Sequence, residues 1–404
     1  MKYRSLLITL LIVFVQPLWA AETTYNYPVP KSDINTSFYT RAFSAEPYDQ
    51  PATHKVKNVI LCIGDGMGFG QVALTRITAV GLEGRLHMER LPVCGAMWTH
   101  SADAVVTDSA ASGTALACGI KTKNKMIGQS LDGTAWSNIC ELAQAHGMKT
   151  GIVATSTITH ATPASYYAHV PNRGQEATIA EQLISSGLNV ALGGGLQYFI
   201  PQDQAGSKRK DNLDLWTMAQ LEDMQVITDP GQLWSAQGSH ILGLFQMGPL
   251  TTEHPEPSLD ELTNKALALL DTQIKDQHEG FFLMIEGSQI DWACHSNDPN
   301  SMIRQTLLFD QAVKSVIDYA RQNPQTLVIV TADHETGGLT LGQGNEPYQP
   351  KVHWASKSHT SLPVPVFAFG PGSEQFEGLL DNTDIPRKIA QLLDFKPFPT
   401  KRTE

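Results

Sequence analysis

The sequence predicts an α/β fold, a three-layer sandwich in which a large, mostly parallel central sheet is flanked by helices. Short apolar runs recur along the chain, and segments with a helical pattern lie between them. The runs cover residues 56–63, 149–155, 281–285, 327–330 and 364–369. An uninterrupted apolar run of this length is typical of a strand that is buried on both faces, as in a parallel sheet. Alternation of such strands with helices predicts a sheet that is covered on both sides.

Two of the helices can be placed from local patterns. Residues 258–261, Ser-Leu-Asp-Glu, form a capping box, in which the serine and glutamate side chains accept hydrogen bonds from each other's backbone N–H. The apolar pattern of this helix extends to Leu270. A second amphipathic helix is expected over about residues 301–321.

The first twenty residues have the pattern of a secretory signal peptide. Lys2 and Arg4 precede an apolar run at 6–15, and Pro-Leu-Trp-Ala at 17–20 suggests cleavage after Ala20. A membrane anchor is the alternative, but the run is short, and no later stretch is apolar for long enough to span a bilayer. We expect a periplasmic or secreted protein that has no membrane contact after cleavage.

The rest of the chain, residues 21–404, is expected to form one domain. Residues 22–55 are polar and are expected to be a loosely held arm on the surface. The patterns weaken after the three glycines at 193–195, which suggest a tight turn. Residues from about 196 to 257 are therefore predicted to be loop insertions over the site.

The charge of the chain limits its partners. It carries 29 lysines and arginines against 40 aspartates and glutamates, a net charge of −11. Loss of residues 1–20 would remove two positive charges and leave about −13. This charge argues against nucleic acid as a dedicated partner. A phosphate-bearing substrate would depend on positive groups close to the site.

The five cysteines are too few and too scattered for a disulfide framework. In an oxidising compartment, a bridge within Cys94, Cys118 and Cys140 stays open.

Acidic residues and a histidine follow several of the predicted strands. Asp65, Glu286 and the pair Asp333-His334 each come at the end of an apolar run. Open α/β sheets bind ligands along the edge formed by the carboxyl ends of their strands. These side chains are therefore expected to lie close together.

A second pattern suggests a metal. Asp291 and His295 are four residues apart, on one face if the segment is helical, and can then chelate one divalent ion. Nitrogen and oxygen ligands suit zinc, whereas carboxylate and hydroxyl ligands suit magnesium.

Asp108 and Ser109 open a run of small residues that predicts the start of a helix. Unpaired backbone N–H groups and the positive end of the helix dipole collect there, so an anion beside Ser109 would be stabilised. Alone, the pattern predicts only a helix cap. The acidic residues and histidines elsewhere favour a catalytic serine.

In these motifs the sequence resembles the alkaline phosphatases. Six pieces carry the resemblance in the family's order, from about Val56 to the apolar run at 364–369. They are residues 64–68 (Gly-Asp-Gly-Met-Gly), 107–112 (Thr-Asp-Ser-Ala-Ala-Ser), 161–164 (Ala-Thr-Pro-Ala) followed by Arg173, 286–295, 331–336 (Thr-Ala-Asp-His-Glu-Thr) and 359–360 (His-Thr). Each piece alone is unspecific, and the ordered set is specific.

The resemblance implies roles for individual residues. Ser109 would be the nucleophile that becomes phosphorylated, Arg173 would grip two phosphoryl oxygens, and Asp108 would orient Arg173. Two zinc ions and one magnesium ion are implied. Their ligands would be Asp65, Asp333 and His334 for one zinc, Asp291, His295 and His359 for the other, and Asp65, Thr162 and Glu286 for magnesium.

Two positions differ from the enteric bacterial enzyme, which has Asp and Lys where this chain has His160 and Trp292. Other members resemble this chain in having His at the first position, and some marine bacterial members also have Trp at the second. Both residues are expected to take part in substrate binding, although Trp292 has the alternative role of a rim residue that packs over the helix. Whether the third metal is magnesium or zinc stays open.

The segment from His334 to His359 is short, so no large inter-subunit domain is expected there, although a homodimer through other surfaces stays possible. His353 is a second candidate for the role of His359. We prefer His359 because a threonine and the last predicted strand follow it.

The function implied is that of an exported, metal-dependent phosphomonoesterase that hydrolyses small phosphate monoesters through a phosphoserine. The alternatives are a phosphodiesterase of the same superfamily and a non-catalytic periplasmic protein that binds zinc or phosphate. Arg173 argues against a diesterase, because its planar fork matches a phosphoryl group with several free oxygens.

Overall fold

The computed structural model describes residues 36–42, 44–51, 55–274, 279–344 and 350–402. The predicted signal peptide, residues 1–20, lies outside this range. Among the described residues, no helix combines the length and apolarity needed to cross a membrane.

A ten-stranded sheet forms the centre of the fold, with the strand order β14-β2-β13-β8-β1-β7-β3-β4-β6-β5. Its strands are β1 (Asn58–Gly64), β2 (Val93–Trp98), β3 (Lys149–Thr157), β4 (Val190–Gly194), β5 (Gln225–Ile227), β6 (Ile241–Leu244), β7 (Phe281–Gly287), β8 (Thr326–Thr331), β13 (Val364–Phe369) and β14 (Gly378–Asp381). Every residue of β1, β7, β8 and β13 is buried. The continuous apolar runs therefore mark strands at the centre of the sheet, as predicted.

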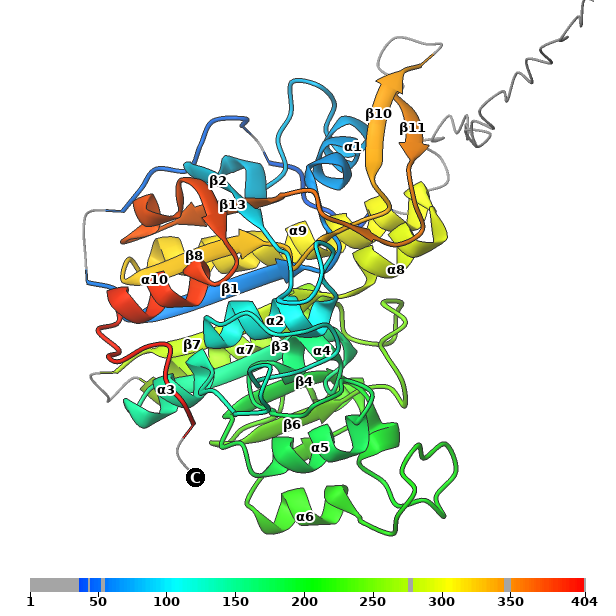
Figure 1. The fold of residues 1–404 in the computed structure, drawn as a ribbon, viewed down its shortest axis with the longest axis vertical. Helices are drawn as coiled ribbons and strands as arrows, with labels where there is room; N and C mark the ends of the chain where they lie inside the picture. The colour runs from blue at the N-terminus through cyan, green and yellow to red at the C-terminus, as the bar shows by residue number, and fades with distance from the viewer. Residues whose placement is uncertain (1–35, 43, 52–54, 275–278, 345–349, 403–404) are drawn as a thin grey trace, which may run out of the picture.

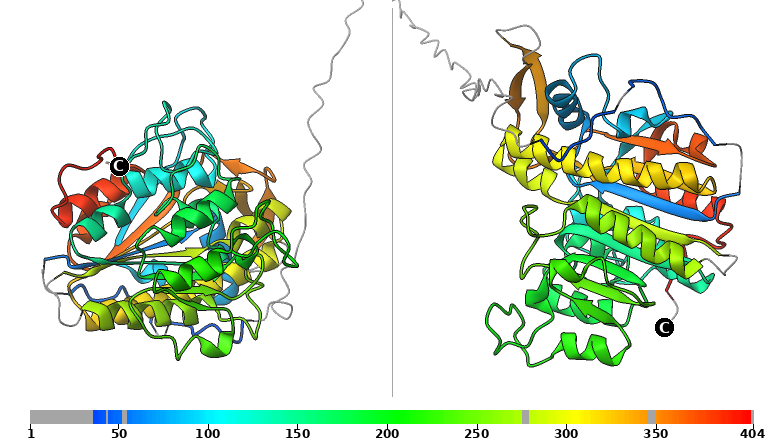
Figure 2. Two further views of the ribbon diagram at one scale, coloured as in Figure 1. Left: turned by 90° about the horizontal axis from the view of Figure 1, so that it is seen from below. Right: turned by 180° about the vertical axis from the view of Figure 1, so that it is seen from behind.

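Helices cover both faces of this sheet (Figures 1 and 2). The longest, α9 (Pro299–Gln322), packs with α7 (Leu259–Ile274) on one face. The opposite face carries α2 (Ser109–Cys118), α3 (Ile139–Ala145) and α10 (Asp384–Leu392). The remaining helices are α1 (Phe69–Ala79), α4 (Ala161–Ala164), α5 (Glu176–Ile184), α6 (Leu215–Leu221) and α8 (Gln289–Ser296). The expected three-layer α/β sandwich is confirmed.

The capping box before α7 is present. Ser258 N–H donates to Glu261 Oε2 at 2.8 Å, and Glu261 N–H donates to Ser258 Oγ at 3.2 Å. The helix expected over residues 301–321 is α9.

One strand runs against the others. β13 pairs antiparallel with both β2 and β8, whereas the other ladders of this sheet are parallel. A strand buried on both faces is apolar whichever way it runs, so its apolar pattern did not reveal its direction.

The stretch 193–257 contains more regular structure than expected. The glycines at 193 and 194 end β4, and only Gly195 turns the chain, with φ of 106°. β5, β6 and α6 follow, and the two strands extend the sheet to its edge. They are three and four residues long, too short for a clear pattern in the sequence.

Within the polar arm, residues 36–42 and 44–51 are held by buried contacts. The Tyr39 hydroxyl donates to Asp310 Oδ2 at 2.6 Å, and the Tyr48 hydroxyl lies 2.9 Å from His87 Nδ1. Both tyrosines are buried. The expectation of a loosely held terminus is therefore wrong for these residues.

A short hairpin lies in the segment between His334 and His359, in which no large inter-subunit domain was expected. Between β9 (Glu335–Thr336) and β12 (His359–Thr360), the residues that the structure describes form β10 (Leu339–Gln343) and β11 (Pro350–Trp354), which project from the body (Figure 1). All five cysteines are free thiols, so the bridge left open by the sequence is absent.

Candidate active site

Three neighbouring strands bring the acidic residues together. β1 lies between β7 and β8. Asp65 follows β1, Glu286 lies near the end of β7, and Asp333 stands two residues after β8. All three side chains are fully buried. The carboxyl edge of the sheet therefore collects these groups, as the sequence predicted.

Carboxylate and imidazole atoms form three overlapping groups of the metal-binding type. The groups are Asp291, His295 and His359, then Asp65, Asp291 and His334, then Asp65, His160 and Glu286; within each group the ligand atoms lie within 4.8 Å of one another. The first group is the set predicted for one zinc. In the second, Asp291 takes the place expected for Asp333, but Asp333 Oδ2 is still 3.2 Å from His334 Nε2. Thr162 is fully buried in α4, two residues after His160.

Helix α8 puts Asp291 and His295 on one face, as their spacing predicted. His295 Nε2 lies 3.3 Å from Asp291 Oδ2 and 3.2 Å from His359 Nε2. β12 carries His359 and pairs with β9, so that His359 lies opposite Thr336. His353, the other candidate, lies opposite Thr340 in the projecting hairpin.

Several buried polar atoms of this cluster have no hydrogen-bond partner among the described residues. They are both carboxylate oxygens of Asp65, Glu286 Oε1, Asp333 Oδ2, Thr162 Oγ1 and His160 Nδ1. Buried polar atoms are rarely left unpaired, because each then costs its full desolvation free energy. Oxygen and nitrogen atoms that converge in this way fit bound cations.

The pKa values reflect the crowding of negative groups. Burial and the neighbouring carboxylates raise the pKa of Asp65 well above its usual value and that of Asp333 to about 8. Burial raises the pKa of Glu286 to about 7. Since like charges this close repel one another, the carboxylates hold protons unless cations replace them.

The histidines are shifted in opposite directions. The hydrogen bond with Asp291 raises the pKa of His295 to about 9. Burial, followed by the charges of His359 and Arg173, lowers the pKa of His334 well below its usual value. Burial and the charge of Arg173 lower that of His160 to about 3. His334 and His160 are therefore neutral at neutral pH, as metal ligands and hydrogen-bond acceptors must be.

Ser109 is the first residue of α2, and Asp108 caps the helix by accepting the backbone N–H of Ala111 at 3.0 Å. The Ser109 hydroxyl lies 3.3 Å from His334 Nε2, and Ser109 is 2% exposed. It thus stands both at a helix N-terminus and beside the cluster, as predicted.

Arg173 lies between two other predicted residues. Its Nη1 is 3.3 Å from Asp108 Oδ2, and its Nη2 is 2.9 Å from His160 Nε2. Because the guanidinium only donates, His160 Nε2 must accept. The rings of His160 and Trp292 meet in a T-shaped arrangement, at 82° to each other and with 6.2 Å between the ring centres. Arg173, Asp108, His160 and Trp292 therefore form one connected set.

Sequence reasoning missed residues that hold the cluster in place. The Thr336 hydroxyl donates to Asp291 Oδ1 and lies 3.2 Å from His334 Nδ1. The Ser156 and Ser288 hydroxyls donate to Glu286 Oε2 at 3.2 and 2.6 Å. A threonine two residues after a histidine is too common in sequences to indicate that it supports a metal ligand. Ser156 is far from Glu286 in the sequence, and only the folded chain brings them together.

Backbone carbonyls orient two of the histidines. Nδ1 of His295 faces the Lys357 carbonyl at 2.6 Å, and Nδ1 of His359 faces the Thr107 carbonyl at 2.8 Å. Such contacts fix which nitrogen carries the proton and direct Nε2 into the cluster. No sequence pattern could have shown them, because any residue offers a carbonyl.

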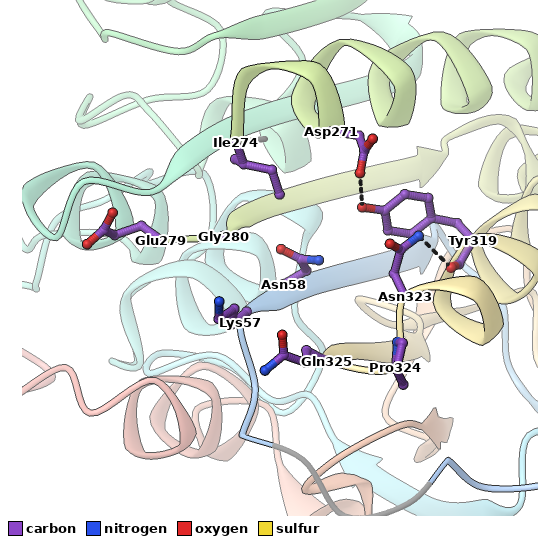
Figure 3. Close-up of a pocket in the computed structure, with 10 residues that line it drawn as sticks. All are labelled: Lys57, Asn58, Asp271, Ile274, Glu279, Gly280, Tyr319, Asn323, Pro324 and Gln325. Atoms are coloured by element: carbon purple, nitrogen blue, oxygen red, sulfur yellow. Dashed lines mark hydrogen bonds between the residues drawn. The ribbon is translucent and has the colours of Figure 1, made fainter. Parts of the chain in front are cut away.

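A cavity of about 540 Å³ lies at the other end of the central strands. Figure 3 shows it beside Lys57 and Asn58 at the start of β1, with Asp271 and Tyr319 from α7 and α9. None of the predicted site residues lines it. It is therefore separate from the cluster described above.

Comparison with known proteins places the chain in a family. Residues 56–352 match the profile of the alkaline phosphatase family. Alkaline phosphatase 4 of Bacillus subtilis is 32% identical over 438 residues, which cover 88% of this chain and 92% of the relative. The alkaline phosphatase of the Antarctic bacterium TAB5 superposes with a TM-score of 0.77 at 37% identity, over 84% of this chain and 99% of the other. A variant of the TAB5 enzyme, with Mg bound in its M3 site, superposes with a TM-score of 0.76 at 36% identity, over 85% of this chain and 99% of the other.

The metal-binding type of the cluster agrees with this match, since the family is metal dependent. The family's substrates are small phosphate monoesters. The chain therefore belongs to the alkaline phosphatase family and is an alkaline phosphatase, a phosphomonoesterase.

Proposed function

We propose that the chain hydrolyses phosphate monoesters in two steps, with Ser109 as nucleophile. The observation that carries this proposal is the position of the Ser109 hydroxyl, at a helix N-terminus and 3.3 Å from His334 Nε2. In the first step the Ser109 hydroxyl loses its proton to solvent and Ser109 Oγ bonds to phosphorus. The bond from phosphorus to the ester oxygen breaks, and the alkoxide that leaves takes a proton from water. In the second step a water molecule loses a proton and bonds to phosphorus, the bond to Ser109 breaks, Ser109 Oγ takes up a proton, and inorganic phosphate is released.

Arg173 and Asp108 would bind the phosphoryl group. The guanidinium offers parallel N–H groups that match two phosphoryl oxygens, and the Asp108 carboxylate holds its orientation. The first backbone N–H groups of α2 add a favourable environment for the anion.

His160 and Trp292 would complete the substrate site. His160 accepts a hydrogen bond from Arg173, which supports a role in directing the guanidinium. Trp292 is half-buried beside His160, which supports a role at the rim of the site.

Two zinc ions and one magnesium ion are proposed as cofactors. Asp65, Asp333 and His334 would hold one zinc, Asp291, His295 and His359 the other, and Asp65, Thr162 and Glu286 magnesium. The unpartnered oxygens of Asp65, Thr162, Glu286 and Asp333 support this assignment, as does the Mg in the M3 site of the TAB5 variant. Bound metals would supply Lewis-acid stabilisation of the attacking and leaving oxygens.

We also propose that residues 1–20 direct export and are removed, and that residues 21–404 act as one domain in the periplasm or outside the cell. The basis for export is the charged and apolar pattern of residues 1–20.

The test compares a chromogenic phosphate monoester with the matching diester. The parent protein and Ser109→Ala are each stripped of metal and then refilled with zinc and magnesium. Only the refilled parent is expected to turn over, with the monoester preferred. Equal activity of Ser109→Ala would mean that Ser109 only caps α2 and that water attacks directly.

A further inference from the structure

A tight turn at Asn124 and Lys125 joins both members of the Asp108–Arg173 pair. The backbone N–H of Lys125 donates to Asp108 Oδ2 at 3.0 Å. The carbonyl of Lys125 accepts the backbone N–H of Arg173 at 2.7 Å. Arg173 Nη1 reaches the same Asp108 oxygen at 3.3 Å. The main chain of one residue therefore links the aspartate to the arginine that it orients.

Asn124 fixes the other side of the turn. Its Oδ1 accepts the backbone N–H of Asp108 at 3.0 Å, and its Nδ2 donates to the Val106 carbonyl at 3.1 Å. Its own N–H donates to Asp103 Oδ1 at 3.0 Å. The side chain of Asn124 thus holds the loop that leads into Ser109 in a defined place relative to the turn.

The backbone of Lys125 is in an unusual conformation. Its φ is 74°, in the left-handed region that lysine rarely adopts. Such a conformation persists only where the surroundings determine it, and it is concentrated at functional sites. The side chain of Lys125 is exposed, so its packing does not account for the conformation. The conformation is instead explained by the two backbone hydrogen bonds, which Lys125 donates to Asp108 and accepts from Arg173.

We propose that Asn124 and Lys125 are positioning residues for substrate binding: their turn sets the distance and angle at which Arg173 meets the phosphoryl group. This inference rests on the proposed role of Arg173. It assigns the effect of Lys125 to its backbone and not to its ammonium group. Substitutions that disturb the turn should weaken the binding of substrate and of inorganic phosphate.

Three variants of the metal-loaded enzyme separate backbone from side chain. Lys125→Val places a β-branched residue at positive φ and should distort the turn. Lys125→Gly accepts the same φ, keeps both backbone bonds and removes the ammonium. Asn124→Ala removes the two side-chain hydrogen bonds. The matched control is Asp223→Val, because Asp223 is another exposed residue with positive φ, 56°, between α6 and β5.

The measured quantities are KM for a chromogenic monoester, kcat, and the inhibition constant of inorganic phosphate. Lys125→Val and Asn124→Ala are expected to raise KM and the inhibition constant about tenfold or more, as a small misplacement of a binding group does. Asp223→Val should leave both constants unchanged, and Lys125→Gly should raise them far less than Lys125→Val does. An equal rise for Lys125→Gly and Lys125→Val would overturn the inference, because the ammonium would then be the active part.

The double variant of Lys125→Val with Arg173→Ala distinguishes an effect on Arg173 from a general loss of stability. If the turn acts through Arg173, Lys125→Val should raise KM no further in the Arg173→Ala background. A full second increase would show that the turn acts independently and would contradict the inference. If Arg173→Ala itself left KM unchanged, the proposed role of Arg173 would fail; if it raised KM and Lys125→Val did not, only this inference would fail.

Discussion

The Nε2 atoms of His295 and His359 face each other at 3.2 Å, while the Nδ1 atom of each ring is held by a backbone carbonyl. A neutral ring whose Nδ1–H donates to a carbonyl has only a lone pair at Nε2. Two lone pairs that face each other repel unless a proton or a metal ion lies between them. Without metal, a proton on His295 takes this place, because the hydrogen bond with Asp291 raises the pKa of His295 to about 9.

His359→Ala is expected to remove one zinc ion from the enzyme. After the substitution, only Asp291 and His295 remain of the three proposed ligands of this zinc. Metal content of the purified protein, measured by mass spectrometry after dialysis against buffered zinc, should fall by one ion per chain. His353→Ala is the matched control, because His353 lies in the β10–β11 hairpin, opposite Thr340. An unchanged zinc content in His359→Ala would remove His359 from the site.

The metal-free protein should lose stability as the pH rises from about 6.5 to 9. In the folded state Asp333 keeps its proton up to about pH 8 and His295 up to about pH 9, from ordinary values of 3.8 and 6.5. The unfolded chain has released both protons above pH 6.5, so the folded state binds more of them. The free energy of unfolding therefore falls with pH across this window.

Urea denaturation at several pH values measures this slope. Zinc and magnesium should flatten it, because bound ligands are already deprotonated. Asp333→Asn should reduce the slope of the metal-free protein. A metal-free protein whose stability is constant or rises over this window would contradict the assignment of these raised pKa values.

Thr336→Val should weaken zinc binding without removing a ligand. The hydroxyl of Thr336 donates to Asp291 and adjoins His334, so it orients ligands of both proposed zinc sites. Loss of such a group typically costs 10- to 100-fold in metal affinity. Competition with a zinc chelator measures the change. Thr340→Val, at an exposed position of the nearby β10, should retain the parent affinity.

Tyr39→Phe should destabilise the fold and leave catalysis intact. The Tyr39 hydroxyl donates to the buried Asp310, which also accepts the backbone N–H groups of His87 and Met88. Loss of one bond to a buried carboxylate is expected to cost about 1–3 kcal/mol. The urea midpoint should fall with kcat and KM unchanged. An unchanged midpoint would mean that the arm adds nothing to stability.

The sequence predicted the central strands because each contains an uninterrupted apolar run, as a strand buried on both faces does. It also predicted the edge at which Asp65, Glu286 and Asp333 meet, since polar residues after such strands can lie nowhere else. The direction of β13 and the strands β2, β4, β5, β6 and β14 were missed. The direction of a strand leaves no trace in its composition. β2 is buried at only two of its six residues, β4 ends in glycines that suggested a turn, and β5, β6 and β14 are too short to show a period.

The residues that hold the ligands were harder to predict than the ligands. Asp291 and His295 have a spacing with a chemical meaning, and Ser109 follows a capping aspartate. Asn124 acts on Asp108 through contacts that only the folded chain creates. Polar residues of this kind are common in loops, so their pattern in the sequence carries no signal.

A covalent phosphoserine is the central prediction, and rapid acid quenching tests it most directly. The metal-loaded enzyme is mixed with a phosphate monoester, quenched within one turnover at low pH, digested and analysed by mass spectrometry. The serine mechanism predicts one added phosphoryl group on the peptide that contains Ser109, and none in Ser109→Ala. Full turnover by the parent with no phosphopeptide, together with activity in Ser109→Ala, would contradict it.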